Sequence, residues 1–309
     1  MVQVDISARH DKSGMLRSAF APLAAVVVAM ISITLGASVA KKLFIDVGPV
    51  GTTALRLTLA AILLSVGFRI WRVPVTRAVV RAALPYGLSL GAMNLLFYMA
   101  IDRIPLGVAL AFEFTGPLAV ATFTSQQTRD FGWIALAVIG LALLLPLRIG
   151  GHALDPVGIA FALAAGVFWG NYIVMGRRAG EALGAEAPAF GMIVGALLAI
   201  PFGVVEGGAA LLTPQVLGLA LVVALLSSAI PYTLEMFALR RLPTRTFGVL
   251  TSGEPAVGAV VGALLLHEKL PLAKWLGIAG IVSASIGITI TSRTSAGKEN
   301  ERRKPLLEN

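Results

Sequence analysis

The 309-residue chain contains no cysteine and few charged residues. The absence of cysteine excludes a disulfide framework and thiolate chemistry. Charged residues make up only 13% of the chain, about half of the share of roughly 25% that is usual in soluble domains. The three histidines, His10, His152 and His267, lie outside the apolar runs and show no metal-ligand spacing. We therefore expect neither a metal nor a cofactor.

Long apolar runs fill most of the chain instead. Hydrophobic residues account for 57% of it, and the mean hydropathy is +0.86. Ten runs are long enough to cross a bilayer, which takes about 20 residues per helix. They cover residues 18–40, 49–68, 83–101, 105–124, 131–147, 156–175, 187–205, 214–238, 247–266 and 271–290. Because backbone groups in hydrocarbon must be satisfied within the segment, we predict an all-α integral membrane protein with ten transmembrane helices.

The distribution of basic residues predicts the orientation of the helices. The net charge of +9 does not indicate nucleic-acid binding, because Lys and Arg lie between the runs and at the ends. The termini and every second link from 69–82 onward hold 18 of them, whereas the alternate links hold 6. Cytoplasmic loops carry the excess of Lys and Arg. Both the N-terminal segment 1–17 and the charged tail 291–309 are therefore predicted to be cytoplasmic.

The first run could also be a signal peptide, since Ser38 to Ala40 resembles a cleavage site. Its apolar part is longer than the roughly 7–15 residues of a signal peptide. We therefore expect the run to remain as a membrane helix.

The two halves of the chain match at a nearly constant offset. The matched pairs are AIDRIP (100–105) with ALRRLP (238–243), Pro117 with Pro255, Trp133 with Trp275, and Lys41-Lys42 with Arg177-Arg178. They indicate a duplicated five-helix unit, residues 18–147 and 155–290. Because five is odd, the second copy enters the membrane from the opposite side. Such inverted repeats recur in transporters, where the substrate site lies near the midplane between the copies.

Residues 111–119, AFEFTGPLA, place a carboxylate and a Gly-Pro pair inside the fourth run. Pro117 has no N–H, so the carbonyl of Glu113 loses its helical partner. Pro255 does the same to Thr251 in the second copy. Irregular backbone at this depth is tolerated where it lines a water-filled cavity or is buried in protein. The pattern therefore predicts a cavity at these two points, with a purely structural kink as the alternative.

The predicted helix breaks carry acidic residues that are costly inside a membrane. The residues of the breaks are Gly116, Pro117, Gly253 and Pro255. Glu113 and Glu254 are candidates for binding a ligand or a proton. For Glu254 the alternative is a structural one, because Glu before Pro can cap a half-helix.

Other polar side chains gather on neighbouring runs. With the acids, the candidate substrate-binding residues are Arg56, Asn94, Tyr98, Glu113, Thr115, Trp169, Tyr172, Tyr232, Glu235, Ser252 and Glu254. Asn94 and Tyr98 are four residues apart and so share a helix face. The aromatic residues could instead be packing residues or interface anchors. Arg56 could either pair with a buried acid or extend its side chain to the membrane surface.

With AFEFTGPLA and LLLHEKLPLAKWLGIAGIVSASIGI (264–288) in view, the chain resembles the drug/metabolite transporter superfamily, and within it the EamA family of bacterial permeases. The resemblance runs from about residue 20 to about residue 292 and is close at 86–101, 105–121 and 232–248. It implies a ten-helix exporter of small amino acids, threonine and homoserine foremost, in the bacterial inner membrane. It also implies a central cavity between the two halves and leaves proton antiport open.

Three rival functions remain open at this point. The site could export other small metabolites or cationic drugs, for which acids and aromatic residues suffice. A zwitterionic amino acid needs an acid for its ammonium group, and an Arg or a helix N-terminus for its carboxylate. An intramembrane enzyme would need a catalytic cluster that the runs lack, and a receptor or scaffold would not need an inverted repeat. The expected partners are a small amino acid, the lipid bilayer and, as a candidate, protons, with no nucleic acid and no defined oligomeric state.

Overall fold

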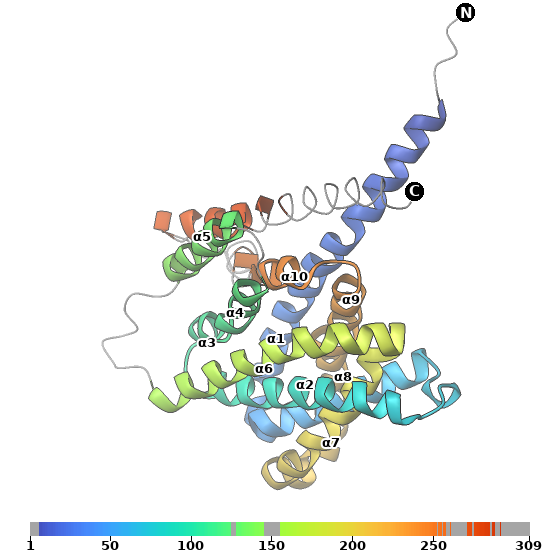
Figure 1. The fold of residues 1–309 in the computed structure, drawn as a ribbon. Helices are drawn as coiled ribbons and strands as arrows, with labels where there is room; N and C mark the ends of the chain where they lie inside the picture. The colour runs from blue at the N-terminus through green and yellow to red at the C-terminus, as the bar shows by residue number, and fades with distance from the viewer. Residues whose placement is uncertain are drawn as a thin grey trace, which may run out of the picture.

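The computed structural model describes residues 6–124, 128–144 and 155–251, together with residues 253–254, 256–257, 260, 271–273, 275–284, 286–287 and 291. Regular structure in this part of the chain is helical throughout, without a strand (Figure 1). The helices are α1 (Ile6–Gly67), α2 (Arg77–Arg103), α3 (Leu106–Glu113), α4 (Thr115–Phe123), α5 (Thr128–Leu144), α6 (Pro156–Leu183), α7 (Ala187–Gly207), α8 (Pro214–Ala224), α9 (Ile230–Leu239) and α10 (Thr244–Thr251). Short helical turns are η1 (Ile70–Arg72), η2 (Gly184–Glu186), η3 (Gly208–Leu212) and η4 (Leu225–Ala229).

Four helical stretches are long and apolar enough to cross a membrane. They are Phe20–Gly67, Arg77–Arg103, Pro156–Leu212 and Pro214–Leu239. Shorter apolar helices cover Val108–Phe123 and Trp275–Ala284. The prediction of an all-α protein with membrane-spanning apolar helices is therefore confirmed, while the count of ten helices and the inverted repeat stay predictions.

Glycines divide the two longest stretches. Gly48 lies inside α1 with φ 68° and ψ 174°, which splits α1 into two helices. Gly184 has φ 68° and ends α6. Glycine adopts such positive φ values without the steric cost of a Cβ, and Pro49 suits the first position of the helix that follows Gly48. The break in α1 thus falls at Gly48 rather than at the end of the apolar run.

A carboxylate from α7 caps the second helix of α1. The Glu206 Oε2 atom accepts hydrogen bonds from the backbone N–H groups of Val50 at 2.7 Å and Gly51 at 2.8 Å. A Cβ on Gly48 would lie 2.4 Å from the Glu206 carboxyl carbon. Gly48 therefore provides both the positive φ and the space that this cap needs.

The helices α2 and α6 lie side by side across the molecule (Figure 1). The start of α6 lies at the end of α2, where a Cβ on Gly158 would lie 2.8 Å from Ile104. Further along α6, a Cβ on Gly176 would lie 3.1 Å from the ring of Tyr86, which is near the start of α2. The two helices are thus antiparallel. Close approach at small residues is typical of helix packing in membranes.

The first helix of α1 packs against α8, η4 and α9. The Ser32 hydroxyl donates to the carbonyl of Leu226 at 2.6 Å, and a Cβ on Gly36 would overlap Ser227. The second helix of α1 packs against α7, where a Cβ on Gly203 would lie 2.3 Å from that of Ala54. Helices from the first 124 residues therefore pack mainly against helices from the second part of the chain.

The helix α5 lies beside residues 275–284 at one edge of the molecule (Figure 1). A Cβ on Gly140 would lie 2.7 Å from the carbonyl oxygen of Gly277. The Trp133 Nε1 atom donates to Thr291 Oγ1 at 3.1 Å. This pair again joins a helix of the first half to one of the second.

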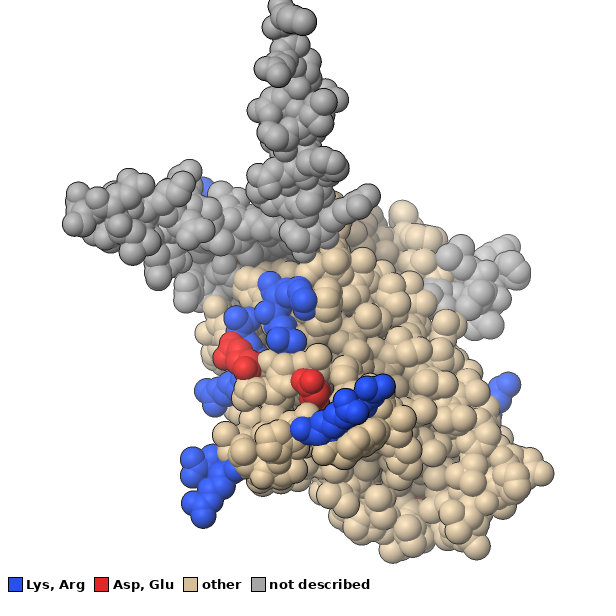
Figure 2. Space-filling view, turned by 90° about the vertical axis from the view of Figure 1, so that its right-hand side faces the viewer, with Lys and Arg blue, Asp and Glu red and all other residues tan. Residues whose placement is uncertain are grey.

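Figure 2 shows a face on which Lys and Arg side chains gather around two carboxylates, with a mostly uncharged surface beyond them. Elsewhere large apolar side chains are exposed, among them Ile45, Phe123 and Val205. Exposed apolar surface on this scale marks a membrane or protein contact. It agrees with a molecule surrounded by lipid.

Candidate functional site

The fourth apolar run forms two short helices instead of one. The helix α3 ends at Glu113, α4 begins at Thr115, and Phe114 lies between them with φ −64° and ψ −13°. Pro117 lies in the first turn of α4 and offers no N–H to the carbonyl of Glu113. The interruption therefore falls three residues before Pro117.

The interruption is packed directly against the backbone of α6. A Cβ on Gly116 would lie 1.8 Å from the carbonyl oxygen of Gly166, and a Cβ on Gly166 would lie 2.6 Å from the carbonyl oxygen of Glu113. Neither glycine leaves room for a side chain. This contact explains the Gly116 of the Gly-Pro pair better than the helix break itself does.

A second interruption follows α10. Thr251 ends α10, Gly253 forms a turn, and Glu254 lies in helical conformation. The N–H of Gly253 donates to the carbonyl of Leu250 at 2.9 Å. The predicted residues Ser252 and Pro255 lie outside the described residues.

A cavity lies between the two interruptions. Its volume, measured as the space open to the centre of a water molecule, is about 50 Å³. Its lining comes from both halves of the chain: Ile33, Ala37, Arg56, Met93, Asn94, Phe97, Tyr98, Leu110, Glu113, Trp169, Ser227, Tyr232, Glu235 and Glu254. Eight of these residues are candidates from the sequence, namely Arg56, Asn94, Tyr98, Glu113, Trp169, Tyr232, Glu235 and Glu254.

Three carboxylates line this one cavity. Glu113 ends α3, Glu235 belongs to α9, and Glu254 follows the second interruption. Each of them is at most 5% exposed. The structure thus brings one acid from each interruption to the same cavity, with Glu235 as a third, and their role in binding a substrate stays a prediction.

Arg56 is the cation of the cavity. It is 3% exposed, so it does not extend to the membrane surface. Its Nη1 donates to the carbonyl of Ser227 at 3.0 Å, its Nη2 donates to Asn94 Oδ1, and its guanidinium lies 4.6 Å from the centroid of the Tyr98 ring. Among the described residues no carboxylate lies within 4 Å of it. Arg56 is therefore a buried charge held by neutral groups.

Tyrosines connect the remaining polar groups. Asn94 Nδ2 donates to the Tyr232 hydroxyl at 2.9 Å, and the Tyr172 hydroxyl donates to Glu235 Oε2 at 2.9 Å. The rings of Tyr172 and Tyr232 meet edge to face at 5.6 Å. Tyr172 does not line the cavity itself, but its hydrogen bond orients the carboxylate of Glu235, which does.

Two further candidates differ in their placement. Trp169 lines the cavity and packs against Phe114, with ring centroids 4.7 Å apart. Thr115 is exposed, its hydroxyl bonds to the carbonyl of Phe112 at 2.7 Å, and it is not part of the cavity lining.

The sequence reasoning missed six lining residues: Ile33, Ala37, Met93, Phe97, Leu110 and Ser227. The helical spacing of Met93 and Phe97 beside Asn94 and Tyr98 could have found two of them. Ser227 contributes its backbone carbonyl, which accepts from Arg56. It lies in η4, a π-helical turn in which the N–H of Ile230 donates to the carbonyl of Leu225, five residues back. Such turns occur often at functional sites, and they leave no compositional signal.

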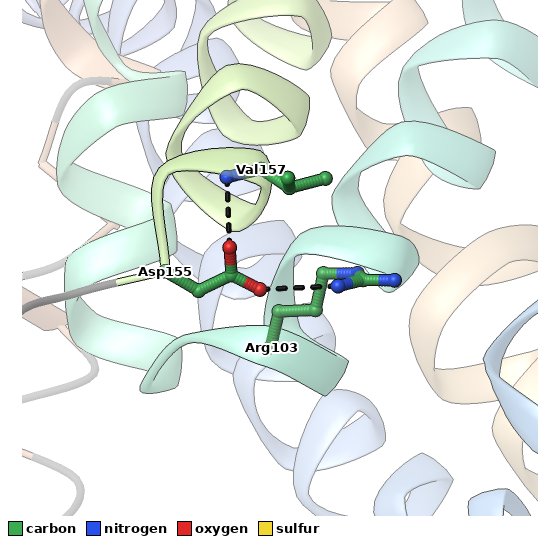
Figure 3. Close-up of polar contacts among 3 residues, drawn as sticks. All are labelled: Arg103, Asp155 and Val157. Atoms are coloured by element: carbon green, nitrogen blue, oxygen red, sulfur yellow. Dashed lines mark hydrogen bonds and ion pairs between the residues drawn. The ribbon is translucent and has the colours of Figure 1, made fainter.

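At the N-terminus of α6, away from the cavity, Asp155 makes two polar contacts (Figure 3). Its Oδ1 accepts from the backbone N–H of Val157 at 2.9 Å, and its Oδ2 accepts from Arg103 Nη1 at 3.1 Å. The hydrogen bond from Val157 and then that from Arg103 hold the pKa of Asp155 below its usual value. The contact joins the end of α2 to the start of α6.

Known proteins resemble this chain closely. Residues 156–290 match the EamA-like transporter family. The threonine/homoserine exporter RhtA of Escherichia coli (strain K12) is 48% identical over 272 residues, which are 88% of this chain and 92% of RhtA. The uncharacterized inner membrane transporter YedA of the same strain is 27% identical over 242 residues, 75% of this chain and 79% of YedA.

A solved crystal structure has the same fold. It superimposes with a TM-score of 0.71 over 90% of this chain and 98% of its own, at 18% identity. The relatives are transporters, which confirms the prediction of a transporter rather than an enzyme. The chain belongs to the EamA-like transporter family.

Proposed function

We propose that this protein exports small amino acids, threonine and homoserine first, by alternating access. The observation that carries the proposal is the presence of both signs of charge in one buried cavity, Arg56 together with Glu113, Glu235 and Glu254. A zwitterion needs a partner for each of its charges. The name of RhtA, at 48% identity, supports threonine and homoserine as the substrates.

The size of the cavity supports a small substrate. A water molecule needs about 10–15 Å³ of such volume, so the cavity of about 50 Å³ holds about three to five waters. A small amino acid displaces a similar amount. A large drug would require the helices to move apart.

Export of cationic drugs is the weaker alternative. A cation would pair with the three acids, but it would leave Arg56 as a second positive charge in the same cavity. Like charges in a medium of low dielectric repel strongly.

We propose proton antiport as the coupling, because the carboxylates outnumber the single arginine of the lining and one of them can carry a proton after the substrate leaves.

We further propose ten transmembrane helices in two inverted repeats, 18–147 and 155–290. The helix contacts support this arrangement. In an inverted repeat, a contact between α6 and α2 should have a counterpart between the first helix of α1 and η4, and both contacts occur. In the same way, Gly166 would correspond to Met30 and Thr115 to Gly253. Both pairs are close: a Cβ on Gly166 would lie 3.2 Å from Thr115 Oγ1, and a Cβ on Gly253 would lie 4.0 Å from Met30 Cε.

The proposed sidedness has both termini in the cytoplasm. It is supported by the gathering of basic residues from alternate links, since Arg177 Nη1 bonds to the carbonyl of Leu242 and a Cβ on Gly180 would touch Arg240. Reporter fusions at the C-terminus and near Glu206 should report opposite sides of the inner membrane. The same side at both positions would exclude the inverted repeat.

Proteoliposomes test the transport. Vesicles loaded with radiolabelled threonine or homoserine should lose label faster than protein-free vesicles, and a pH-sensitive dye inside should report acidification as label leaves. Efflux at the protein-free rate with correctly inserted protein would exclude these substrates. Efflux without any pH change would exclude proton antiport but leave the export of these amino acids standing.

A further inference from the structure

We propose that Arg56 and Tyr98 form the subsite for the α-carboxylate of the exported amino acid. The inference rests on the proposed function and assigns one part of the substrate to named residues. Its consequence is a strict requirement for the carboxylate, which amines and amino-acid amides lack.

The charge of Arg56 has no counter-ion among the described residues. Its two hydrogen bonds go to neutral acceptors, the carbonyl of Ser227 and Asn94 Oδ1, and its Nε has no partner among the described residues. A guanidinium has five donors, so most of them remain free. Burial of a charge without a counter-ion is costly, and three carboxylates of the same cavity stay out of contact. The arrangement therefore leaves a place for an anion from outside.

The guanidinium of Arg56 is also held in place before a ligand arrives. Its central carbon lies 4.6 Å from the centroid of the Tyr98 ring, and its two bonds reach α2 and η4, which come from different halves of the chain. A guanidinium with free N–H groups can bind a carboxylate through two parallel hydrogen bonds. Arg56 is thus fixed by contacts that leave donors for a carboxylate.

The Tyr98 hydroxyl is buried without a hydrogen-bond partner among the described residues, and Tyr98 lines the same cavity. Buried hydroxyl groups are nearly always satisfied. Both this hydroxyl and the Nε of Arg56 are closed to water in this state, so a substrate carboxylate would satisfy them once the cavity opens during alternating access.

Two helix N-termini could also take a carboxylate. The one after the second interruption begins with Glu254, whose own acid disfavours a second carboxylate there, and the other is that of α4. Thr115, its first residue, is exposed and bonds back to Phe112, and it does not line the cavity. The carboxylate is therefore assigned to Arg56, which leaves the acids for the ammonium group.

Binding to the purified protein in detergent, measured by calorimetry, tests the assignment. The ligands are threonine and threoninamide, which share the ammonium and hydroxyl groups and differ only at the carboxylate. Wild type should bind threonine at least tenfold more tightly than threoninamide. Arg56→Gln should lose at least tenfold in affinity for threonine and none for threoninamide, Tyr98→Phe should show a smaller loss of the same selectivity, and Arg56→Lys should recover part of it.

Arg241→Gln is the matched control, because Arg241 lies outside the cavity and bonds to Phe237 of its own helix. Equal affinity of wild type for both ligands would overturn the carboxylate subsite and leave amino-acid export standing. Equal losses for both ligands in folded Arg56→Gln would also overturn it. If Arg56→Gln does not fold, the wild-type comparison and Tyr98→Phe still decide. Failure of wild type to bind either ligand would overturn the proposed function together with the subsite.

Discussion

The first interruption follows Glu113, whereas the second precedes Glu254. In the proposed repeat, Glu113 is equivalent to Thr251, whose hydroxyl bonds back to the carbonyl of Phe247 at 3.0 Å. The acid of the first interruption ends the helix before the break, and the acid of the second lies after the break. If the backbone is duplicated, its two copies therefore carry their acids on opposite sides of the break.

This difference separates the roles that we expect for the two acids. The N–H groups at the start of a helix favour an anion, and the carbonyl groups at its end favour a cation. Glu254 therefore has its own helix start to stabilise a negative charge. Glu113 instead ends α3, where the helix favours a cation, and we propose that the substrate ammonium is this cation.

The two interruptions also differ in packing. Gly116 touches the backbone of Gly166, whereas a Cβ on Gly253 would lie 3.0 Å from the carbonyl of Leu250 and 4.0 Å from Met30 Cε. A Cβ on Gly116 would overlap backbone atoms outright, whereas a Cβ on Gly253 would be a tight contact with one backbone oxygen at 3.0 Å. The first interruption should thus tolerate far less change than the second.

The largest expected effect is that of Gly116→Ala. The added methyl would lie 1.8 Å from the carbonyl oxygen of Gly166, so α4 and α6 must separate. Overpacking of this kind costs about 1–3 kcal/mol, occasionally more. We expect a clear fall in the midpoint of thermal unfolding in detergent and in the amount of folded protein.

Gly253→Ala is the matched comparison for Gly116→Ala. Its methyl meets looser surroundings, so the midpoint should fall by less. Equal destabilisation by the two substitutions would show that the packing difference has no energetic consequence.

The next effect is that of Glu113→Gln on transport. The substitution nearly preserves size and removes the charge. A hydrogen bond to a charged group contributes about 1.5–3 kcal/mol, so threonine efflux should fall by roughly 10- to 100-fold. The unfolding midpoint should stay close to that of wild type.

Thr251→Val at the equivalent position of the proposed repeat should leave efflux nearly unchanged, since within the described part of the chain the Thr251 hydroxyl bonds only inside α10. Pro117→Ala restores an N–H for the carbonyl of Glu113 and should slow efflux by closing the interruption.

If Glu113→Gln exports threonine at the wild-type rate with unchanged pH dependence, Glu113 is structural, and the functional carboxylate should be sought at Glu254 or Glu235.

The smallest expected effect concerns a second pair of equivalent residues, Arg103 and Arg241. Arg103 bonds to Asp155 across the two halves, whereas Arg241 bonds to Phe237 of its own helix. Asp155→Ala removes the ion pair and the cap of α6, whereas Asp155→Asn keeps a capping side chain. The unfolding midpoint should fall slightly for Ala and less for Asn, and Arg241→Ala should not change it.

The effect of Asp155→Ala should depend on pH in a defined direction. The pKa of Asp155 is lowered in the folded protein from its ordinary 3.8. Its stabilisation is therefore complete above about pH 5, and it is lost as the pH falls through the folded-state pKa. The difference between the midpoints of wild type and Asp155→Ala should therefore shrink below pH 3.8 toward the smaller contribution of an uncharged capping side chain. A constant difference across this range would mean that the charge of Asp155 contributes nothing.

The apolar runs located the helices well because a membrane span must be apolar over a set length. They did not locate the helix ends. The first helix of α1 continues past Lys41 and Lys42 to Gly48, and α6 continues past Arg177 to Leu183. Lys and Arg propagate a helix as well as most apolar residues do, so a run marks the thickness of the membrane and not the length of the helix.

The residues of the cavity were predictable where charge or helical spacing pointed inward. Glu113, Glu235 and Arg56 are costly in lipid, which predicted them for the cavity that they line. Thr115 does not line the cavity, because it lies beyond the interruption in α4, and its role stays a prediction. The carbonyl of Ser227 could not have been found, since it depends on a π-helical turn formed against α1.

The cap supplied by Glu206 has a consequence for how the chain is made. The N–H groups of Val50 and Gly51 bond to a carboxylate that lies 156 and 155 residues further along the sequence. At about 5–20 residues per second of synthesis, these groups wait on the order of 10–30 s for that partner. The cap of the second helix of α1 is therefore completed only once Glu206, in the second half of the chain, has been made.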